Sequence, residues 1–175
     1  MLKVCKLSRE VFLLDVVAAE VKPGVTTDYL DKVCHKACLG RNSYFSPLNY
    51  RNFLKSLYTL PNDIVCHGIP DHRVMLNGDI LSLDISIHQG FYLADLKETY
   101  YVGDKAKAAP ENLRLIEMTR QCLKAAMEIV RPGLPIREFG EVIEKMATAR
   151  GCSVVSTWCG HGINTNSHPT PWIPH

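Results

Sequence analysis

Three features that would assign a protein class at once are missing from this sequence: a long apolar run, a strong charge excess and a CxxC motif. No stretch approaches the roughly 18 apolar residues of a membrane span. The first residues, MLKVCKLSREVFLLD, reach charged side chains before an apolar core of signal-peptide length forms. A formal net charge of +2 is too balanced to indicate nucleic-acid binding. We therefore expect a cytoplasmic protein with no membrane and no nucleic-acid partner.

Cysteine usage favours the same compartment. The seven cysteines are an odd number, and Cys34 and Cys38 lie one helical turn apart. We interpret them as reduced, mostly buried thiols. With 46% hydrophobic residues, a chain of 175 residues can bury a sizeable core, and we expect one domain over residues 1–175.

Residues 78–102, GDILSLDISIHQGFYLADLKETYYV, follow the pattern of a β-hairpin. The first strand alternates apolar and polar side chains, and the second is aromatic and β-branched. Gln89 and Gly90 are a candidate two-residue turn between them. This turn predicts a register in which Asp84 lies directly opposite Asp95, with Cβ atoms about 5 Å apart.

Two facing carboxylates in a sheet need a compensating partner, because Asp is depleted in strands and facing like charges are destabilising. They can share a proton, or they can share a cation. A pair at this separation can bridge two divalent ions about 3.5 to 4 Å apart. Two other interpretations stay open: the aspartates are solvated on the open face of the sheet, or the register differs by one residue and sends them to opposite faces.

Helical periodicity appears on both sides of the hairpin. Helices are expected over residues 8–21, 28–40, 110–130 and 135–150. Ser8 and Asp28 are the expected N-caps of the first two. The apolar side chains expected on the inner face of the last two helices are Leu113, Ile116, Leu123, Met127, Phe139, Val142 and Met146.

The two helix pairs resemble each other. VKPGVTT at residues 21–27 matches VRPGLPI at 130–136, and the apolar positions that follow match as well. The match predicts a duplicated α+β unit, with a first half over about 1–105 and an incomplete second half over about 106–175. An incomplete second half would leave the inner face of its helices partly exposed.

Three histidines lie in contexts that suggest more than surface polarity. His67 lies in CHGIP, His161 in CGHGIN and His168 in SHPTP. Neighbouring glycines let the backbone turn tightly and leave an imidazole approachable. Each could be a hydrogen-bonded structural histidine, but together with the aspartates they make a nitrogen and oxygen set suited to Mn, Fe, Co or Zn.

Several motifs in combination resemble type 1 methionine aminopeptidase. They are NDIVCHGIP, GDILSLDISI, DLKETYYVG and CGHGI, with 11 residues from Asp84 to Asp95, while SPLNY and KPGVTT resemble the eukaryotic cytosolic branch. The resemblance covers nearly the whole chain. It implies the α+β pita-bread fold, in which duplicated half-units surround a curved antiparallel sheet and a two-metal site.

The resemblance also implies a function and the residues that carry it. The family removes the initiator methionine from nascent proteins, which implies the N-terminal Met of nascent chains as partner and proximity to the ribosome. Asp84, Asp95 and His161 match three ligands of two divalent metal ions, which would be Co, Mn, Fe or Zn. Asp95 matches the carboxylate that bridges both ions.

Four further residues match substrate-contacting positions. His67 and His168 match the catalytic histidines that contact the substrate and the tetrahedral intermediate. Tyr50 and Phe53 match aromatic positions of the pocket for the methionine side chain, where a thioether gains from contact with aromatic rings. Both aromatics could also be ordinary core residues.

The chain departs from the family pattern at several points. Two glutamate ligands that the resemblance implies, one of them bridging, are not within these 175 residues, so we expect incomplete metal occupancy and weak or no activity in this shortened form. Leu54, Tyr58 and Ser167 replace residue types usual in the family. Two alternatives stay open: a non-catalytic pita-bread module that binds peptides, and a prolidase-like dipeptidase, against which the contexts CHGIP and CGHGI argue.

Overall fold

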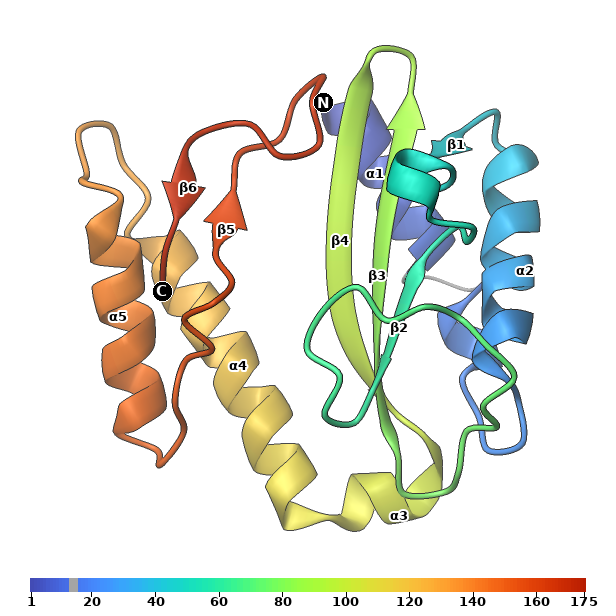
Figure 1. Ribbon diagram of the computed structural model, residues 1–175. Helices are drawn as coiled ribbons and strands as arrows, with labels where there is room; N and C mark the ends of the chain where they lie inside the picture. The colour runs from blue at the N-terminus through green and yellow to red at the C-terminus, as the bar shows by residue number, and fades with distance from the viewer. Residues whose placement is uncertain (13–15) are drawn as a thin grey trace. The chain divides into compact units, whose positions relative to one another are not determined.

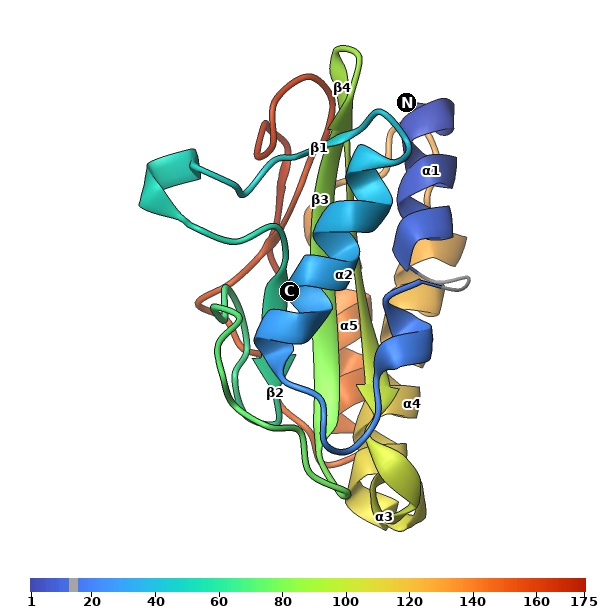
Figure 2. The same ribbon diagram turned by 90° about the vertical axis from the view of Figure 1, so that its right-hand side faces the viewer.

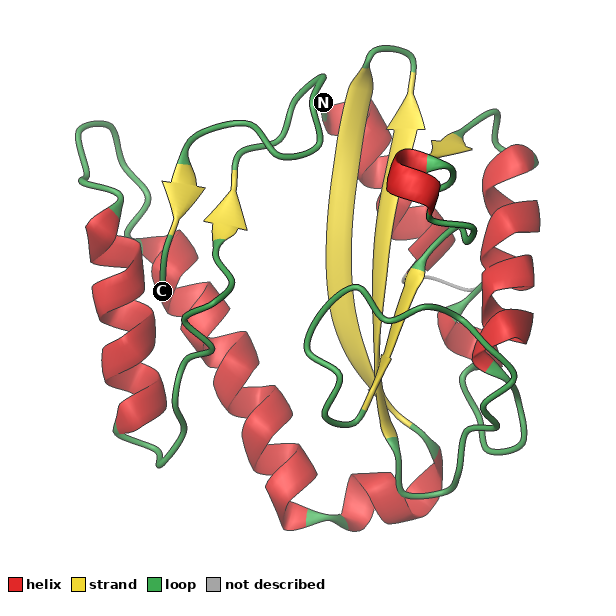
Figure 3. Ribbon diagram, viewed as in Figure 1, coloured by secondary structure: helices red, strands yellow, loops and turns green. Residues whose placement is uncertain are grey.

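The chain forms two compact units of helices and antiparallel strands (Figure 1). The computed structural model describes residues 1–12 and 16–175. The first unit comprises Met1–Ala109 and Asn164–Ser167, and the second comprises Pro110–Ile163 and His168–His175. The mixture of helices and strands agrees with the α+β class expected from the sequence (Figure 3). The expectation of a single domain stays a prediction.

Most of the regular structure belongs to the first unit. Its elements are α1 (Leu2–Phe12), the 3-10 helix η1 (Ala18–Glu20), α2 (Thr27–Leu39), β1 (Tyr44–Phe45), the 3-10 helix η2 (Tyr50–Asn52), β2 (Tyr58–Pro61), β3 (Ile80–Gln89), β4 (Tyr92–Tyr101) and α3 (Gly103–Ala108). The second unit contains α4 (Pro110–Glu128), α5 (Arg137–Thr148), β5 (Gly160–His161) and β6 (Trp172–Ile173). None of the helices in the described part of the chain has the length and apolar character needed to cross a membrane.

Both predicted helix caps in the first unit are wrong. Ser8 lies inside α1 with a fully buried side chain, because this helix begins at Leu2. Residues 13–15 of the predicted helix lie outside the described residues. Thr26 caps α2, and its hydroxyl accepts a hydrogen bond of 3.1 Å from the Tyr29 N–H. Asp28 instead forms ion pairs with Lys32 and Lys55.

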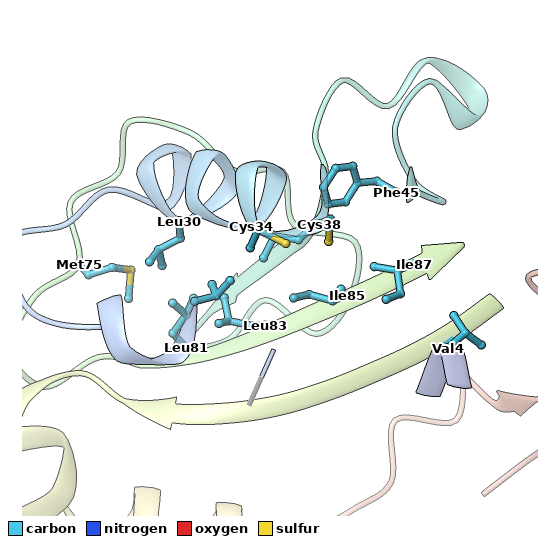
Figure 4. Close-up of a cluster of buried hydrophobic side chains, with 14 of the residues drawn as sticks. Val4, Leu30, Cys34, Cys38, Phe45, Met75, Leu81, Leu83, Ile85 and Ile87 are labelled. Carbon is cyan, nitrogen blue, oxygen red and sulfur yellow. The ribbon is translucent and has the colours of Figure 1, made fainter. Parts of the chain in front are cut away.

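Strand β3 is the centre of a four-stranded antiparallel sheet. It pairs with β4 along its whole length on one side, and with β1 and β2 on the other. The face that carries Leu81, Leu83, Ile85 and Ile87 is fully buried. Helices α1 and α2 cover this face of the sheet (Figure 2), and their side chains pack on it (Figure 4). The buried helix residues in Figure 4 are Val4, Leu30, Cys34 and Cys38.

The hairpin register differs from the predicted one. Gln89 pairs with Tyr92, so the turn residues are Gly90 and Phe91 rather than Gln89 and Gly90. The pairing is therefore shifted by two residues, and Asp84 does not lie directly opposite Asp95. Because side chains alternate with a period of two, a two-residue shift keeps both carboxylates on the same face.

A buried carboxylate, that of Asp79, binds several groups of the long segment between β2 and β3. Asp79 accepts hydrogen bonds from the side chains of Asn62, at 2.9 Å, and Arg73, at 3.2 Å, and from the Leu76 N–H, at 3.0 Å. Burial alone raises the pKa of Asp79, but these hydrogen bonds and the Arg73 charge outweigh it and lower the pKa below 3.8. The segment that contains His67 is thus fixed at its two ends.

We expect Asp79→Ala to lower the free energy of unfolding by about 2 kcal/mol, because Asn62 and Arg73 lose their partner. Since the folded-state pKa of Asp79 is depressed, its contribution is present above the unfolded pKa and is lost progressively as the pH falls through the folded pKa. Urea unfolding of both proteins at pH 7 and at pH 3 measures this. An equal difference between the two proteins at both pH values would contradict the ionic origin of the effect.

The second unit is built around the packing of α4 on α5. Met118 and Cys122 of α4 form a buried cluster with Ala147 of α5. These two α4 residues lie outside the predicted inner stripe. Leu123 and Met127 of that stripe are 60% and 64% exposed, so the expected exposure is observed. Helix α4 therefore carries two apolar stripes, of which one packs within this unit.

Candidate metal centre and substrate site

The polar face of the β3–β4 hairpin carries the two predicted carboxylate ligands. Asp84 pairs with Lys97, and Asp95 pairs with Ser86, which makes the two aspartates diagonal neighbours. Diagonal neighbours of antiparallel strands are about 7 to 8 Å apart at Cα and remain within side-chain reach. The Ser86 hydroxyl donates a hydrogen bond of 2.9 Å to Asp95 Oδ1. This bond fixes the carboxylate of Asp95, which lies on β4.

The carboxylate pair carries more negative charge than its surroundings balance. Burial first, and then the charge of Asp95, raise the pKa of Asp84 to about 7, although the nearby Lys97 acts in the opposite direction. A cation bound between these carboxylates would relieve both effects. The pair therefore has the electrostatic character of a cation site.

The carboxylate pair supplies part of the donor set that a divalent ion takes. Carboxylate oxygens with a nearby imidazole suit Mn, Fe, Co and Zn. Asp84 and Asp95, diagonal neighbours on one face of the hairpin, supply the oxygen part of that set. Within residues 1–12 and 16–175, no group of three or more His, Cys, Asp or Glu side chains is arranged so that it could hold a metal ion. The predicted three-ligand set of Asp84, Asp95 and His161 stays a prediction.

His67 lies in a tightly held turn beside β2. Its φ of 55° is in the left-handed region, which is uncommon for a residue with a side chain. The next residue, Gly68, accepts a hydrogen bond of 3.0 Å from the Thr59 N–H. A Cβ at Gly68 would lie 2.1 Å from the Thr59 carbonyl oxygen, so only glycine allows this approach. The backbone on the C-terminal side of His67 is therefore pressed against β2.

Three rings form a continuous row next to the carboxylates. The ring of Phe53 lies 4.6 Å from that of Tyr58, and Tyr58 lies 5.1 Å from His67, measured between centroids. Tyr58 also pairs with Asp84 across β2 and β3. Burial, followed by the charges of Asp84 and Asp95, raises the pKa of Tyr58 to about 12, so its hydroxyl keeps its proton at neutral pH.

Tyr50 differs from these rings in exposure. It opens η2 and is 50% exposed, with the Arg51 guanidinium 5.5 Å from its ring centroid. Phe53 is half-buried. The structure therefore connects Phe53 with His67 through Tyr58, while the predicted pocket role of Tyr50 remains a prediction.

His161 and His168 are neighbours in the second unit. Their ring centroids are 4.5 Å apart, with the rings inclined at 53°. His161 lies on β5 opposite Trp172 of β6. His161 Nδ1 is 2.8 Å from the Gly162 carbonyl oxygen, which can only accept, so Nδ1 carries the proton and the lone pair of the neutral ring lies on Nε2.

The predicted site residues thus form two local groups. Asp84 and Asp95 share one face of the hairpin in the first unit. His67 belongs to the same unit. His161 and His168 belong to the second unit. The Ser86 contact and the position of Lys97 opposite Asp84 were not predicted from the sequence. Both could have been found by alternation, because each lies two residues from an aspartate on the same strand.

Comparison with known families assigns a chain with this fold and carboxylate pair to the metallopeptidases. The metallopeptidase family M24 matches residues 1–175, and the chain belongs to this family. Membership implies divalent metal ions. Within the family, the chain is 51% identical to methionine aminopeptidase 1 of Schizosaccharomyces pombe, over all of this chain and 46% of that protein.

Solved structures show the same relationship. The methionine aminopeptidase from Rickettsia prowazekii aligns with a TM-score of 0.93 at 36% identity, over 98% of this chain and 67% of that chain. Prolidase from Pyrococcus furiosus aligns with a TM-score of 0.83 at 16% identity, which shows the fold alone. The predicted pita-bread fold and the resemblance to methionine aminopeptidase are confirmed. The chain spans about half the length of the curated relatives it matches.

Proposed function

We propose that this chain carries the chemistry of a methionine aminopeptidase, the metal-dependent removal of the initiator methionine from nascent polypeptides. The observation that carries the proposal is the carboxylate pair of Asp84 and Asp95, which shares one face of the hairpin and bears unbalanced charge. Identity of 51% to methionine aminopeptidase 1 supports the substrate class. A cytoplasmic location and proximity to the ribosome remain predictions.

The proposed metal ligands are Asp84, Asp95 and His161. The Nε2 lone pair of His161 is the nitrogen donor, because Nδ1 donates to the Gly162 carbonyl. Bound Co, Mn, Fe or Zn would supply Lewis-acid activation of a water molecule and of the scissile carbonyl. Ser86 holds the Asp95 carboxylate in place through Oδ1.

The proposed substrate contacts come from histidines and aromatic rings. His67 and His168 donate hydrogen bonds to the peptide carbonyl oxygen as negative charge develops on it, and such donors act strongly where water is excluded. Tyr50 and Phe53 contribute to an apolar pocket for the methionine thioether. The tilted ring contact of His67 with Tyr58, 5.1 Å between centroids, orients the imidazole beside this pocket.

The metal proposal is tested by titrating the metal-free 175-residue polypeptide with Mn²⁺ in a calorimeter. We expect at most one ion per chain, bound weakly, because the three proposed ligands are too few for two well-held divalent ions. Asp95→Asn should abolish the heat of binding, whereas Asp104→Asn, which changes an exposed carboxylate on α3, should not. Release of methionine from Met-Ala-Ser, followed in parallel, should be at least about a thousandfold slower than in an intact relative, a barrier difference of about 4 kcal/mol.

Other outcomes would change the conclusion. Equal binding by the wild type and Asp95→Asn would show that the carboxylate pair is not the metal site. Retention of a methionyl peptide without hydrolysis, at any metal concentration, would favour the peptide-binding module. Turnover equal to that of an intact relative would contradict the expectation of weak activity.

A further inference from the structure

Lys97 links the carboxylate strands to the segment that carries His67. It lies on β4, directly opposite Asp84 and two residues after Asp95. Its ammonium group donates a hydrogen bond of 2.8 Å to the backbone carbonyl of Val65. The side chain therefore connects a strand of the sheet to a segment more than 30 residues earlier in the chain.

The Val65 carbonyl is one of two attachments that flank His67. On the N-terminal side, Val65 accepts from Lys97. On the C-terminal side, the Gly68 carbonyl accepts from the Thr59 N–H at 3.0 Å. His67, with its left-handed φ of 55°, lies between these two points. A backbone in a sparsely populated conformation persists only when its surroundings hold it there.

We propose that Lys97 is a positioning residue that fixes the His67 segment against the strands bearing Asp84 and Asp95. This inference rests on the substrate role proposed above for His67. Lys97 has an exposed side chain and takes no part in the buried cluster of the first unit, so its contribution is to the placement of this segment rather than to the core. The requirement is a long side chain that ends in a hydrogen-bond donor.

Three variants test the requirement for a long side chain that ends in a hydrogen-bond donor. Lys97→Met keeps an unbranched side chain of similar length but removes the donor. Lys97→Arg keeps the charge, and its N–H groups can reach the same carbonyl. Lys36→Met removes an equivalent exposed charge from α2, which packs on the opposite face of the sheet, and serves as the control.

The readouts are taken by NMR on the metal-free protein in the presence of a chelator. The Thr59 amide reports detachment of the segment, because its N–H donates to Gly68. The His67 ring protons report the contact with the Tyr58 ring, 5.1 Å away between centroids, through the ring-current shift. We expect Lys97→Met to accelerate exchange of the Thr59 amide about fivefold, the order expected from loss of one hydrogen bond, and to displace the His67 ring signals.

Rescue decides between positioning and a general loss of structure. Lys97→Arg should restore both readouts, Lys36→Met should change neither, and the central amides of β3 should exchange alike in all variants. Unchanged exchange and unchanged His67 signals in Lys97→Met would overturn the proposal, and so would failure of Lys97→Arg to restore them. Because no metal is present, these results are independent of the calorimetric test of the proposed metal site.

Discussion

Asp84→Asn is expected to stabilise the metal-free chain at pH 8 by up to about 4 kcal/mol. The folded state raises the pKa of Asp84 to about 7 through burial and the charge of Asp95, so ionisation is unfavourable in the folded protein. One pKa unit corresponds to about 1.4 kcal/mol, and asparagine carries no charge to desolvate. The same substitution removes a proposed metal ligand, so the stability gain should accompany loss of Mn²⁺ binding.

The pH dependence gives the sign of this effect. Because the folded-state pKa of Asp84 lies above its unfolded value, stability is full below about pH 4 and decreases as the pH rises through about 7. Denaturant unfolding of both proteins at pH 4 and pH 8 should therefore show a difference only at pH 8. Asp104→Asn is the control for loss of an exposed carboxylate. If Asp84→Asn were less stable than the wild type at pH 8, ionised Asp84 would not destabilise the folded protein.

Gly68→Ala is expected to lower the free energy of unfolding by about 3 kcal/mol, an effect of the size produced by overpacking at a rigid position. The added Cβ would lie 2.1 Å from the Thr59 carbonyl oxygen, and a backbone atom cannot move aside cheaply. The His67 segment would have to separate from β2, which would also break the hydrogen bond from the Thr59 N–H. Thermal unfolding measures the loss, and the His67 ring signals should lose the shift caused by Tyr58.

Gly40→Ala is the matched control for this substitution. Gly40 follows α2 in a helical conformation, with a φ of −62°. A Cβ there would meet its nearest neighbour, the Lys36 carbonyl oxygen, at 3.4 Å. We expect a change within about 0.5 kcal/mol. Similar losses in Gly40→Ala and Gly68→Ala would contradict an origin in the close approach to Thr59.

The sequence predicted the hairpin and its polar face because alternation is a local property. Leu81, Leu83, Ile85 and Ile87 of β3 all lie on the buried face, as expected. The register was missed because glycine tolerates either position of a two-residue turn, and Gly90 is the first turn residue rather than the second. The aspartates still share a face, since the error was an even number of residues.

Other errors have a common cause in tertiary contacts. Ser8 has the chemistry of an N-cap, but α1 starts six residues earlier and buries this hydroxyl. In α4 the periodicity favoured Leu123 and Met127, while the contact with α5 is made by the smaller stripe of Met118 and Cys122. Periodicity identifies an apolar face, but it does not say which neighbour that face meets.

Some functional residues could likewise be predicted from local sequence, and others depend on tertiary contacts. Motifs located His67 and His161, because a histidine next to glycine is visible in the sequence, while His168 lies between serine and proline in SHPTP. The resemblance supplied their roles. The contact between Lys97 and Val65 joins residues distant in sequence, and no local sequence pattern predicts it. Such contacts depend on where a loop comes to lie, which only the folded structure specifies.

The alternation along β3 and β4 also limits which changes in chain length this region can accept. One residue inserted within either strand, between Asp84 and the turn or between the turn and Asp95, would send a carboxylate to the packed face or force a β-bulge. The turn itself is different, because Phe91 at its tip is 82% exposed. Insertions at Gly90 and Phe91 leave both strands in step. We therefore expect this hairpin to accept a change in length at its tip but not within the 10-residue strands on either side.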